Sequence, residues 1–112
     1  MKLQRIAGLP DTALAAAAAF HADWLPGLTA DTSGEDLALI FPPADHTHRG
    51  WRLAAVQGLA RELAPRRVNA LAASGDVAIA AALAYLAGAD GLTGQYLPLD
   101  DAGAGIVVSP PT

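Results

Sequence analysis

The chain contains no cysteine and only one lysine, Lys2. The absence of cysteine excludes a disulfide framework and thiolate metal sites, and it is compatible with a reducing compartment such as the cytoplasm. Charged residues make up only 16% of the sequence, with a formal net charge of −4. Nucleic-acid backbones are bound by clustered Lys and Arg, so this sparse, acidic set predicts no nucleic-acid partner.

Long apolar runs are also lacking. The alanine run Ala15–Ala19 is flanked by Asp11, His21 and Asp23 and is too short to cross a membrane. No signal peptide is visible at the start of the sequence. We therefore expect no membrane partner and a soluble, cytoplasmic protein.

Aromatic residues are few, at 5%, and the 53% hydrophobic content comes largely from alanine. A chain of 112 residues can form one globular domain with a modest core, so we expect a single domain over residues 1–112. Alanine buries little area per residue, and a partner surface would therefore add stability.

Short β-like runs alternate with helical stretches, which is the order of an α/β fold around a parallel sheet. The apolar runs and their spacing predict strands at residues 2–7, 37–41, 68–72 and 95–99, a short tail strand at 106–108, and helices at 12–25, 49–64 and 77–87. The predicted architecture is a Rossmann-like half, with a mostly parallel sheet of about four strands and helices on both faces.

Local sequence signals predict where these helices begin and end and which of their residues face the sheet. Asp11 is expected to cap the first helix and Pro26-Gly27 to end it. Arg66-Arg67 is expected to be a solvated pair at the entrance of the third strand. Apolar stripes at helical spacing predict the sheet-facing residues of the second and third helices, namely Leu53, Val56, Leu59, Leu63 and then Val77, Ala80, Leu83, Leu86.

Three short sequence motifs resemble motifs of the short-chain dehydrogenase/reductase family. Leu59 to Pro65 reads LARELAP and is followed by Val68-Asn69-Ala70, as in a late helix and strand of that family. Thr93-Gly94-Gln95 then leads into the last strand, as the family's Thr-Gly-Gln does. The chain is therefore similar to a truncated, C-terminal half of such an enzyme, and the resemblance implies a Rossmann-like fold.

The family's catalytic Tyr-x-x-x-Lys pair is missing from this sequence. Counting back from Pro65 along the family's helix places Arg49 at the lysine position and Asp45 at the tyrosine position. Asp45 would already be ionised near neutral pH and is a poor proton donor there. The tyrosines present, Tyr85 and Tyr96, fall in later elements. We therefore expect no reductase activity.

The family's cofactor site is missing as well. Its glycine-rich turn, which holds the pyrophosphate at a helix N-terminus, would have to precede Met1. Gly103-Ala104-Gly105 is rich in glycine, but no helix is predicted to follow it, so it is interpreted as a flexible turn. We expect no nicotinamide cofactor.

A polar loop region offers an alternative function, with a site formed by Asp45, His46, His48, Arg49 and Arg52. Its His-x-His spacing is able to chelate zinc or nickel, although His21 is the only other imidazole available as a ligand. The arginines beside the aspartate favour either an anionic ligand or surface ion pairs. This region therefore predicts an enzyme or a binder of a small ligand or metal, against the simpler interpretation of a solvated loop.

Association is the other function that the resemblance implies. In the family, the helices equivalent to residues 12–25 and 49–64 pair across a two-fold axis, and the last helix and strand form a second contact. Ala54, Ala55 and Gly58 would allow close helix approach, or would pack internally. Trp24 and Trp51 are expected to be core or interface anchors rather than ligand-stacking rings. These features predict a non-catalytic module that forms a homo-oligomer or docks onto a full-length reductase.

Overall fold

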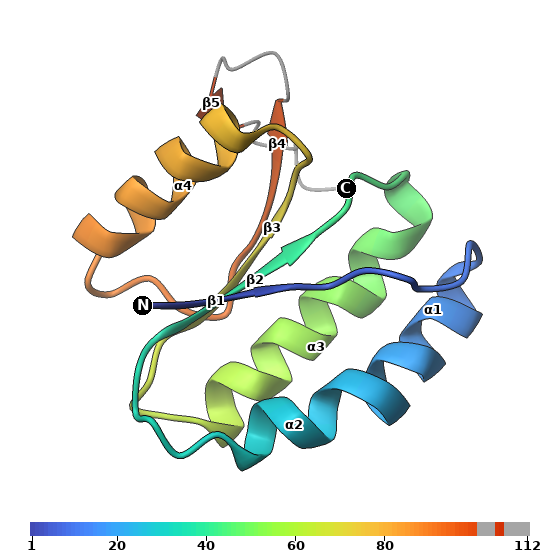
Figure 1. Cartoon of the computed structure of the whole chain (residues 1–112), viewed down its shortest axis with the longest axis horizontal. Helices are drawn as coiled ribbons and strands as arrows, with labels where there is room; N and C mark the ends of the chain where they lie inside the picture. The colour runs from blue at the N-terminus through green and yellow to red at the C-terminus, as the bar shows by residue number, and fades with distance from the viewer. Residues whose placement is uncertain (101–104, 107–112) are drawn as a thin grey trace.

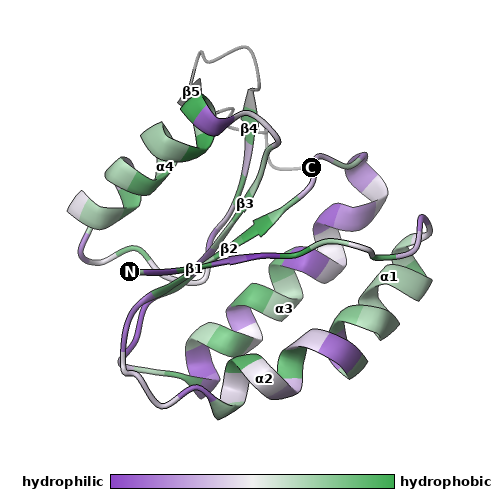
Figure 2. Ribbon diagram, in the orientation of Figure 1, coloured by the Kyte–Doolittle hydropathy of each residue, from purple (hydrophilic) through white to green (hydrophobic). Residues whose placement is uncertain are grey.

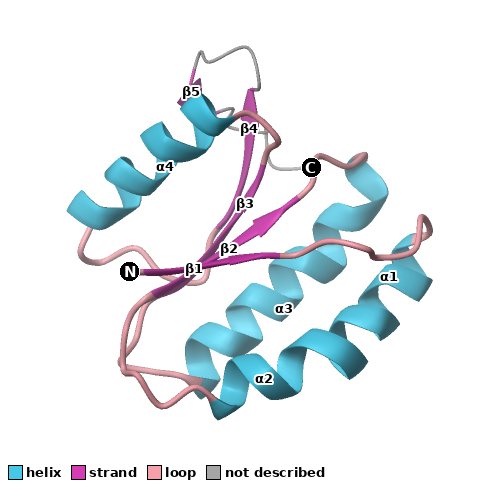
Figure 3. Cartoon of the chain, viewed as in Figure 1, coloured by secondary structure: helices cyan, strands magenta, loops and turns pink. Residues whose placement is uncertain are grey.

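The computed structural model describes residues 1–100 and 105–106 and contains a five-stranded sheet in the order β1-β2-β3-β4-β5 (Figure 1). The first four strands run parallel and the fifth pairs antiparallel with β4. Helices cover both faces of the sheet (Figure 3), which confirms the predicted fold class. The strands are β1 (Lys2–Arg5), β2 (Leu37–Phe41), β3 (Val68–Ala72), β4 (Tyr96–Asp100) and β5 (Gly105–Ile106).

The predicted tail strand is therefore present at its first residue, Ile106, while residues 107 and 108 lie outside the described part of the chain. The turn predicted at Gly103-Ala104-Gly105 also falls largely outside it. The strands at 37–41 and 68–72 have the predicted bounds and are buried throughout. Such continuous burial is typical of parallel strands covered on both faces.

The first helical stretch is longer than predicted, because Pro26-Gly27 does not end it. Helix α1 (Ala13–Ala19) passes into a π-helical turn, η1 (Phe20–Trp24), and then into α2 (Leu25–Ala30). In the π-helical turn the N–H of Leu25 bonds back to the carbonyl of Phe20. Pro26 consequently lies in the first turn of a new α-helical segment, where its missing N–H costs little.

The cap of α1 also differs from the prediction. Thr12, not Asp11, is the N-cap, and its hydroxyl oxygen accepts a hydrogen bond of 3.3 Å from the N–H of Ala15. Aspartate and threonine are both favoured at the N-cap. Which of the two neighbours caps the helix therefore depends on the direction in which the chain enters it.

Two apolar clusters lie on opposite faces of the sheet. Along β2, Leu37, Leu39 and Phe41 contribute to the cluster beneath the first helices, while Ile40 contributes to the cluster on the other face. This alternation follows from the period of two in a strand. The first cluster includes Val56 and Leu59 of helix α3 (Arg49–Glu62), which confirms the predicted sheet-facing stripe of that helix.

Helix α4 (Asp76–Gly88) is rotated relative to the prediction. Val77 is 76% exposed and Ala80 is also exposed, whereas the buried residues are Ala78, Ile79, Ala82 and Leu86. No charged residue occurs between Asp76 and Asp90, so the helix has no polar face to set its orientation. Figure 2 shows that α4 is apolar on all sides, whereas α3 has both hydrophobic and hydrophilic residues.

The crossover through α4 has the opposite hand from the two before it. The stretch α1–η1–α2 and helix α3 lie on one face of the sheet, while α4 lies on the other (Figure 1). The strand order nevertheless advances in a single direction from β1 to β4. Parallel crossovers are almost always of one hand, so this arrangement departs from the general rule. It also leaves Leu3, which is in register with Ala38 on the α4 face, 50% exposed at the sheet edge.

Two arginines join the loops at the amino ends of the strands, which corrects the interpretation of Arg66-Arg67 as a solvated pair. Arg66 pairs with Asp31 at 3.2 Å, and Asp31 also pairs with Lys2 at 3.2 Å. Arg67 pairs with Asp36 at 2.8 Å and donates to backbone carbonyls at the end of α4. The only lysine of the chain is thus an ion-pair partner at the start of β1.

We expect Asp31 to contribute to stability in a pH-dependent manner. Its pKa is lowered to about 2, first by the N–H of Ser33 and next by the Lys2 ammonium group. A carboxylate whose pKa is lower in the folded state stabilises the fold above its unfolded pKa, and that contribution is lost as the pH falls from about 4 to about 2. The loss of unfolding free energy on acidification should therefore be smaller for Asp31→Asn than for the wild type, as measured by urea denaturation.

The matched control for this experiment is Asp90→Asn. Asp90 is exposed and makes no ion pair among the described residues, so its replacement should leave the acid-induced loss unchanged. Identical pH dependence in the wild type and in Asp31→Asn would contradict the assigned role of Asp31.

Candidate functional site

A cleft of about 330 Å³ opens at the carboxyl ends of β1 and β2. Its walls are the loops at residues 9–11 and 42–45, together with His48 and Arg52. Open α/β sheets bind their ligands beyond the carboxyl ends of the strands. We call this the strand-end cleft.

The structure divides the predicted loop site between two hollows. Asp45, His48 and Arg52 line the strand-end cleft. His46 and Arg49 instead line a neighbouring hollow of about 210 Å³, which Asp45 also borders. The five predicted residues therefore do not form one common site.

His48 is buried and has a structural role. The indole N–H of Trp51 donates to its Nδ1 at 3.0 Å, so the proton lies on Nε2, which donates to the carbonyl of Asp11 at 2.9 Å. Both ring nitrogens are thus occupied, and a metal ion could bind only if one of these bonds were broken. Within the described residues, no group of three or more His, Cys, Asp or Glu is arranged to hold a metal ion.

Trp51 is a core anchor, as predicted. Its ring lies 5.6 Å from that of Phe20 and 5.6 Å from that of Phe41. Trp24 likewise packs against the same apolar cluster.

Asp45 caps the 3₁₀ turn η2 (His46–His48) that precedes α3. Its carboxylate accepts hydrogen bonds from the hydroxyl and from the N–H of Thr47. The Thr47 hydroxyl first, and the Thr47 N–H second, hold the pKa of Asp45 below its usual value. The group is therefore a carboxylate at neutral pH and has no proton to donate.

Arg52 is buried, which corrects the interpretation of a surface ion pair. Only 2% of the residue is exposed, and its Nη1 donates to the carbonyl of Pro42 at 2.9 Å and to the hydroxyl of Tyr96 at 3.0 Å. The guanidinium carbon lies 4.6 Å from the centre of the Phe41 ring, which is a cation–π geometry. Sequence reasoning noted Arg52 but gave no sign that it is buried.

The structure keeps the tyrosines and the lysine apart. Tyr85 is on α4, 53% exposed, and Tyr96 is on β4 against Arg52. Lys2 begins β1, at the end of that strand remote from the strand-end cleft. No Tyr–Lys pair is therefore formed in the described structure, and the position of Lys2 excludes it from the cleft.

The motifs that carry the family resemblance connect β3 with the segment that leads into β4. The N–H of Val68 donates to the Thr93 hydroxyl at 3.0 Å. Asn69 donates through Nδ2 to the carbonyl of Leu92 at 2.9 Å and accepts through Oδ1 from the N–H of Gln95 at 3.1 Å. Val-Asn-Ala and Thr-Gly-Gln therefore bond to each other and position β4, and they carry no reactive group.

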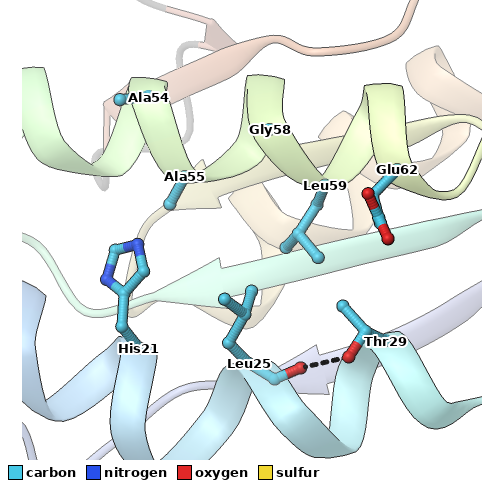
Figure 4. Close-up of a pocket in the computed structure, with 8 residues that line it drawn as sticks. All are labelled: His21, Leu25, Thr29, Ala54, Ala55, Gly58, Leu59 and Glu62. Atoms are coloured by element: carbon cyan, nitrogen blue, oxygen red, sulfur yellow. Dashed lines mark hydrogen bonds between the residues drawn. The ribbon is translucent and has the colours of Figure 1, made fainter.

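A second hollow lies between the two helices that cover one face of the sheet (Figure 4). This groove has a volume of about 350 Å³. The side chains of Leu25 and Leu59 point towards one another across it, and the His21 ring points towards α3 (Figure 4). We call it the helix groove; it is lined by His21, Leu25, Thr29, Ala54, Ala55, Gly58, Leu59 and Glu62.

Sequence reasoning found only one side of the helix groove. Ala54, Ala55 and Gly58 were singled out as small residues on α3, whereas His21 and Thr29 were not. On the opposite wall, Thr29 lies beyond the predicted end of the first helix, whereas His21 lies within the predicted helix and no residue type marks it as facing α3. The spacing of His21, Leu25 and Thr29, four residues apart each time, places them on one helix face and was the available signal.

The fold and the cleft together define a Rossmann-like α/β half whose strand-end site lacks a Tyr–Lys pair. Over residues 4–99 the sequence matches the family described as "SDR-like: Short chain dehydrogenase-like protein". The chain belongs to this short-chain dehydrogenase-like family. No curated protein and no solved structure matches it significantly. Among the described residues, none of the helices is long and apolar enough to cross a membrane.

Proposed function

We propose that the chain is a non-catalytic short-chain-dehydrogenase-like module that acts by association, with a second copy of itself or with a full-length reductase of the family. The observation that carries this proposal is the outer surface of α4. Val77 is 76% exposed and Tyr85 is 53% exposed there. A helix that is apolar on all sides is normally buried on all sides, so this surface is suited to a partner.

The outer surface of α4 is continuous along the helix. Val77, Ala81 and Tyr85 follow each other at intervals of four residues, and all three are exposed. The alanines beside them leave the surface smooth and allow a partner helix to approach closely. We call this exposed strip the α4 surface.

The helix groove supports the same proposal from the opposite face. It is an open, mostly apolar hollow between η1–α2 and α3, and small residues form much of its α3 wall. A ridge of side chains from a partner helix could enter such a groove. The chain thus has two surfaces suited to association, one on each side of the sheet.

The residues at the catalytic positions support a non-catalytic role. Asp45 is an ionised helix cap, and Arg49 supplies a guanidinium group where the family has a lysine ammonium group. The only side-chain ammonium group is engaged with Asp31, at the other end of β1. A cytoplasmic location is part of this proposal, and the complete absence of cysteine is compatible with it.

We expect the wild-type protein to be a dimer by size-exclusion chromatography with light scattering. Ala81→Arg, in the middle of the α4 surface, should weaken self-association at least about tenfold, because a buried unpaired charge costs more than 1.4 kcal/mol. Arginine has nearly the helix propensity of alanine, so circular dichroism should show an unchanged fold. Ala54→Arg tests the helix groove in the same way.

Thr32→Arg is the matched control. Thr32 is exposed in the loop after α2 and lines none of the hollows described above, so the added charge should leave association unchanged. Docking to a full-length reductase is tested by co-elution of the two proteins. A strictly monomeric wild-type protein that co-elutes with no such reductase would falsify the proposed function.

A further inference from the structure

Arg52 carries a buried charge whose hydrogen-bond partners are both neutral. Both of its hydrogen bonds come from Nη1, while its Nε is buried and has no partner. None of the ion pairs among the described residues includes Arg52. Because a guanidinium group stays charged at physiological pH, this is a buried cation without an anion.

The strand-end cleft gives an anion access to this charge. Arg52 lines the cleft, whose volume of about 330 Å³ is that of a small ligand pocket. The planar guanidinium group matches the two oxygens of a carboxylate, and such charge-assisted bonds are the strong ones. A carboxylate in the cleft would therefore supply the missing counter-charge.

Two carboxyl groups at the rim narrow the class of ligand. Asp11 and Asp45 are exposed and line the same cleft. They would repel a phosphate or a dicarboxylate that approached Arg52. A molecule with a positive group turned towards the rim would instead be attracted at both ends.

The geometry points to a binding site for a small zwitterion of the amino-acid type, with its carboxylate on Arg52 and its ammonium group near Asp11 and Asp45. This site goes beyond the proposed function and is independent of it, because the cleft lies at the strand ends and shares no lining residue with the helix groove. A dimer that binds no ligand in the cleft would contradict only the site, and a monomer that binds ligand there would contradict only the proposed self-association.

The test is a titration of the ¹⁵N-labelled wild-type protein with three matched probes, followed by NMR at constant ionic strength. L-alanine has both charged groups, propionate lacks the amine and ethylammonium lacks the carboxylate. We expect L-alanine to shift the Arg52 Nε–Hε signal and the amide signals of residues 44–48 saturably. Propionate should bind about threefold more weakly, because an exposed ion pair contributes little, and ethylammonium should give no saturable shift.

Variants test which residues bind the carboxylate and which bind the ammonium group of the ligand. Arg52→Met should weaken L-alanine binding at least about tenfold, since a charged hydrogen-bond donor is lost. The double variant Asp11→Asn, Asp45→Asn should bind L-alanine no better than the wild type binds propionate. Asparagine is also a good helix cap, so this change should preserve the turn at Asp45.

The wild-type titration decides the outcome even if Arg52→Met does not fold. An Arg52 signal that is not shifted saturably by L-alanine, or that is shifted equally by ethylammonium, would overturn the site. Equal affinity for propionate and L-alanine would overturn the zwitterionic ligand class.

Discussion

Phe41→Ala is expected to lower the free energy of unfolding by about 3–5 kcal/mol, which is the usual cost of removing a fully buried phenylalanine. Phe41 has no exposed surface, and its ring lies 5.7 Å from Phe20 and 6.4 Å from Tyr96. It also stacks beneath the Arg52 guanidinium group. Marginally stable domains have a total of about 5–15 kcal/mol, so the variant should lose much of its stability in urea denaturation.

Two comparisons test why Phe41 matters. Phe41→Leu keeps most of the buried apolar volume and should cost less than half as much as Phe41→Ala. Leu14→Ala truncates an apolar side chain at a position where the residue is 85% exposed. This change should alter the free energy of unfolding by less than about 0.5 kcal/mol. A Phe41→Ala variant as stable as Leu14→Ala would be incompatible with a core centred on this ring.

Asn69→Ala is expected to cost about 2–3 kcal/mol, because two polar groups lose their buried partner. Asn69 is only 4% exposed, and its amide bonds both the carbonyl of Leu92 and the N–H of Gln95. These bonds fix the segment that leads into β4. We expect lower stability in urea and faster amide exchange at Gln95.

Gln95→Ala is the matched control for this prediction. The contact from Gln95 to Asn69 uses the backbone N–H, which alanine retains. Its side chain is bonded only weakly, to the carbonyl of Thr93 at 3.4 Å. If truncating Gln95 cost as much as truncating Asn69, the bonds of the Asn69 amide would not explain the effect.

The strands β2 and β3 were predictable from sequence because they are buried throughout. Leu37–Phe41 is apolar at every position, and such a short continuous run is typical of a strand covered on both faces. The end of the first helix was not predictable in the same way. Pro26 normally ends a helix, but a π-helical turn just before it lets the helix continue, and no single residue indicates that turn.

The orientation of α4 and the burial of Arg52 depend on tertiary structure. A helix without charged residues gives no polar face from which to predict its rotation, so Val77 was wrongly placed inwards. Arg52 follows Arg49 on the same helix and has the same local signal, yet Arg49 is exposed, whereas Arg52 is buried and bonds to Pro42 and Tyr96. The sequence therefore predicted three of the residues around the cleft, Asp45, His48 and Arg52, but not which of their charges would be buried.

The ion-paired position of Lys2 has a practical use. It carries the only side-chain amine of the chain, and 43% of its side chain is accessible. Amine-reactive dyes and sensor-chip linkers will therefore couple to side chains at one defined place, at the start of β1. The strand-end cleft lies at the opposite end of that strand, so a fluorophore or surface attached through this amine leaves the cleft open to added ligand.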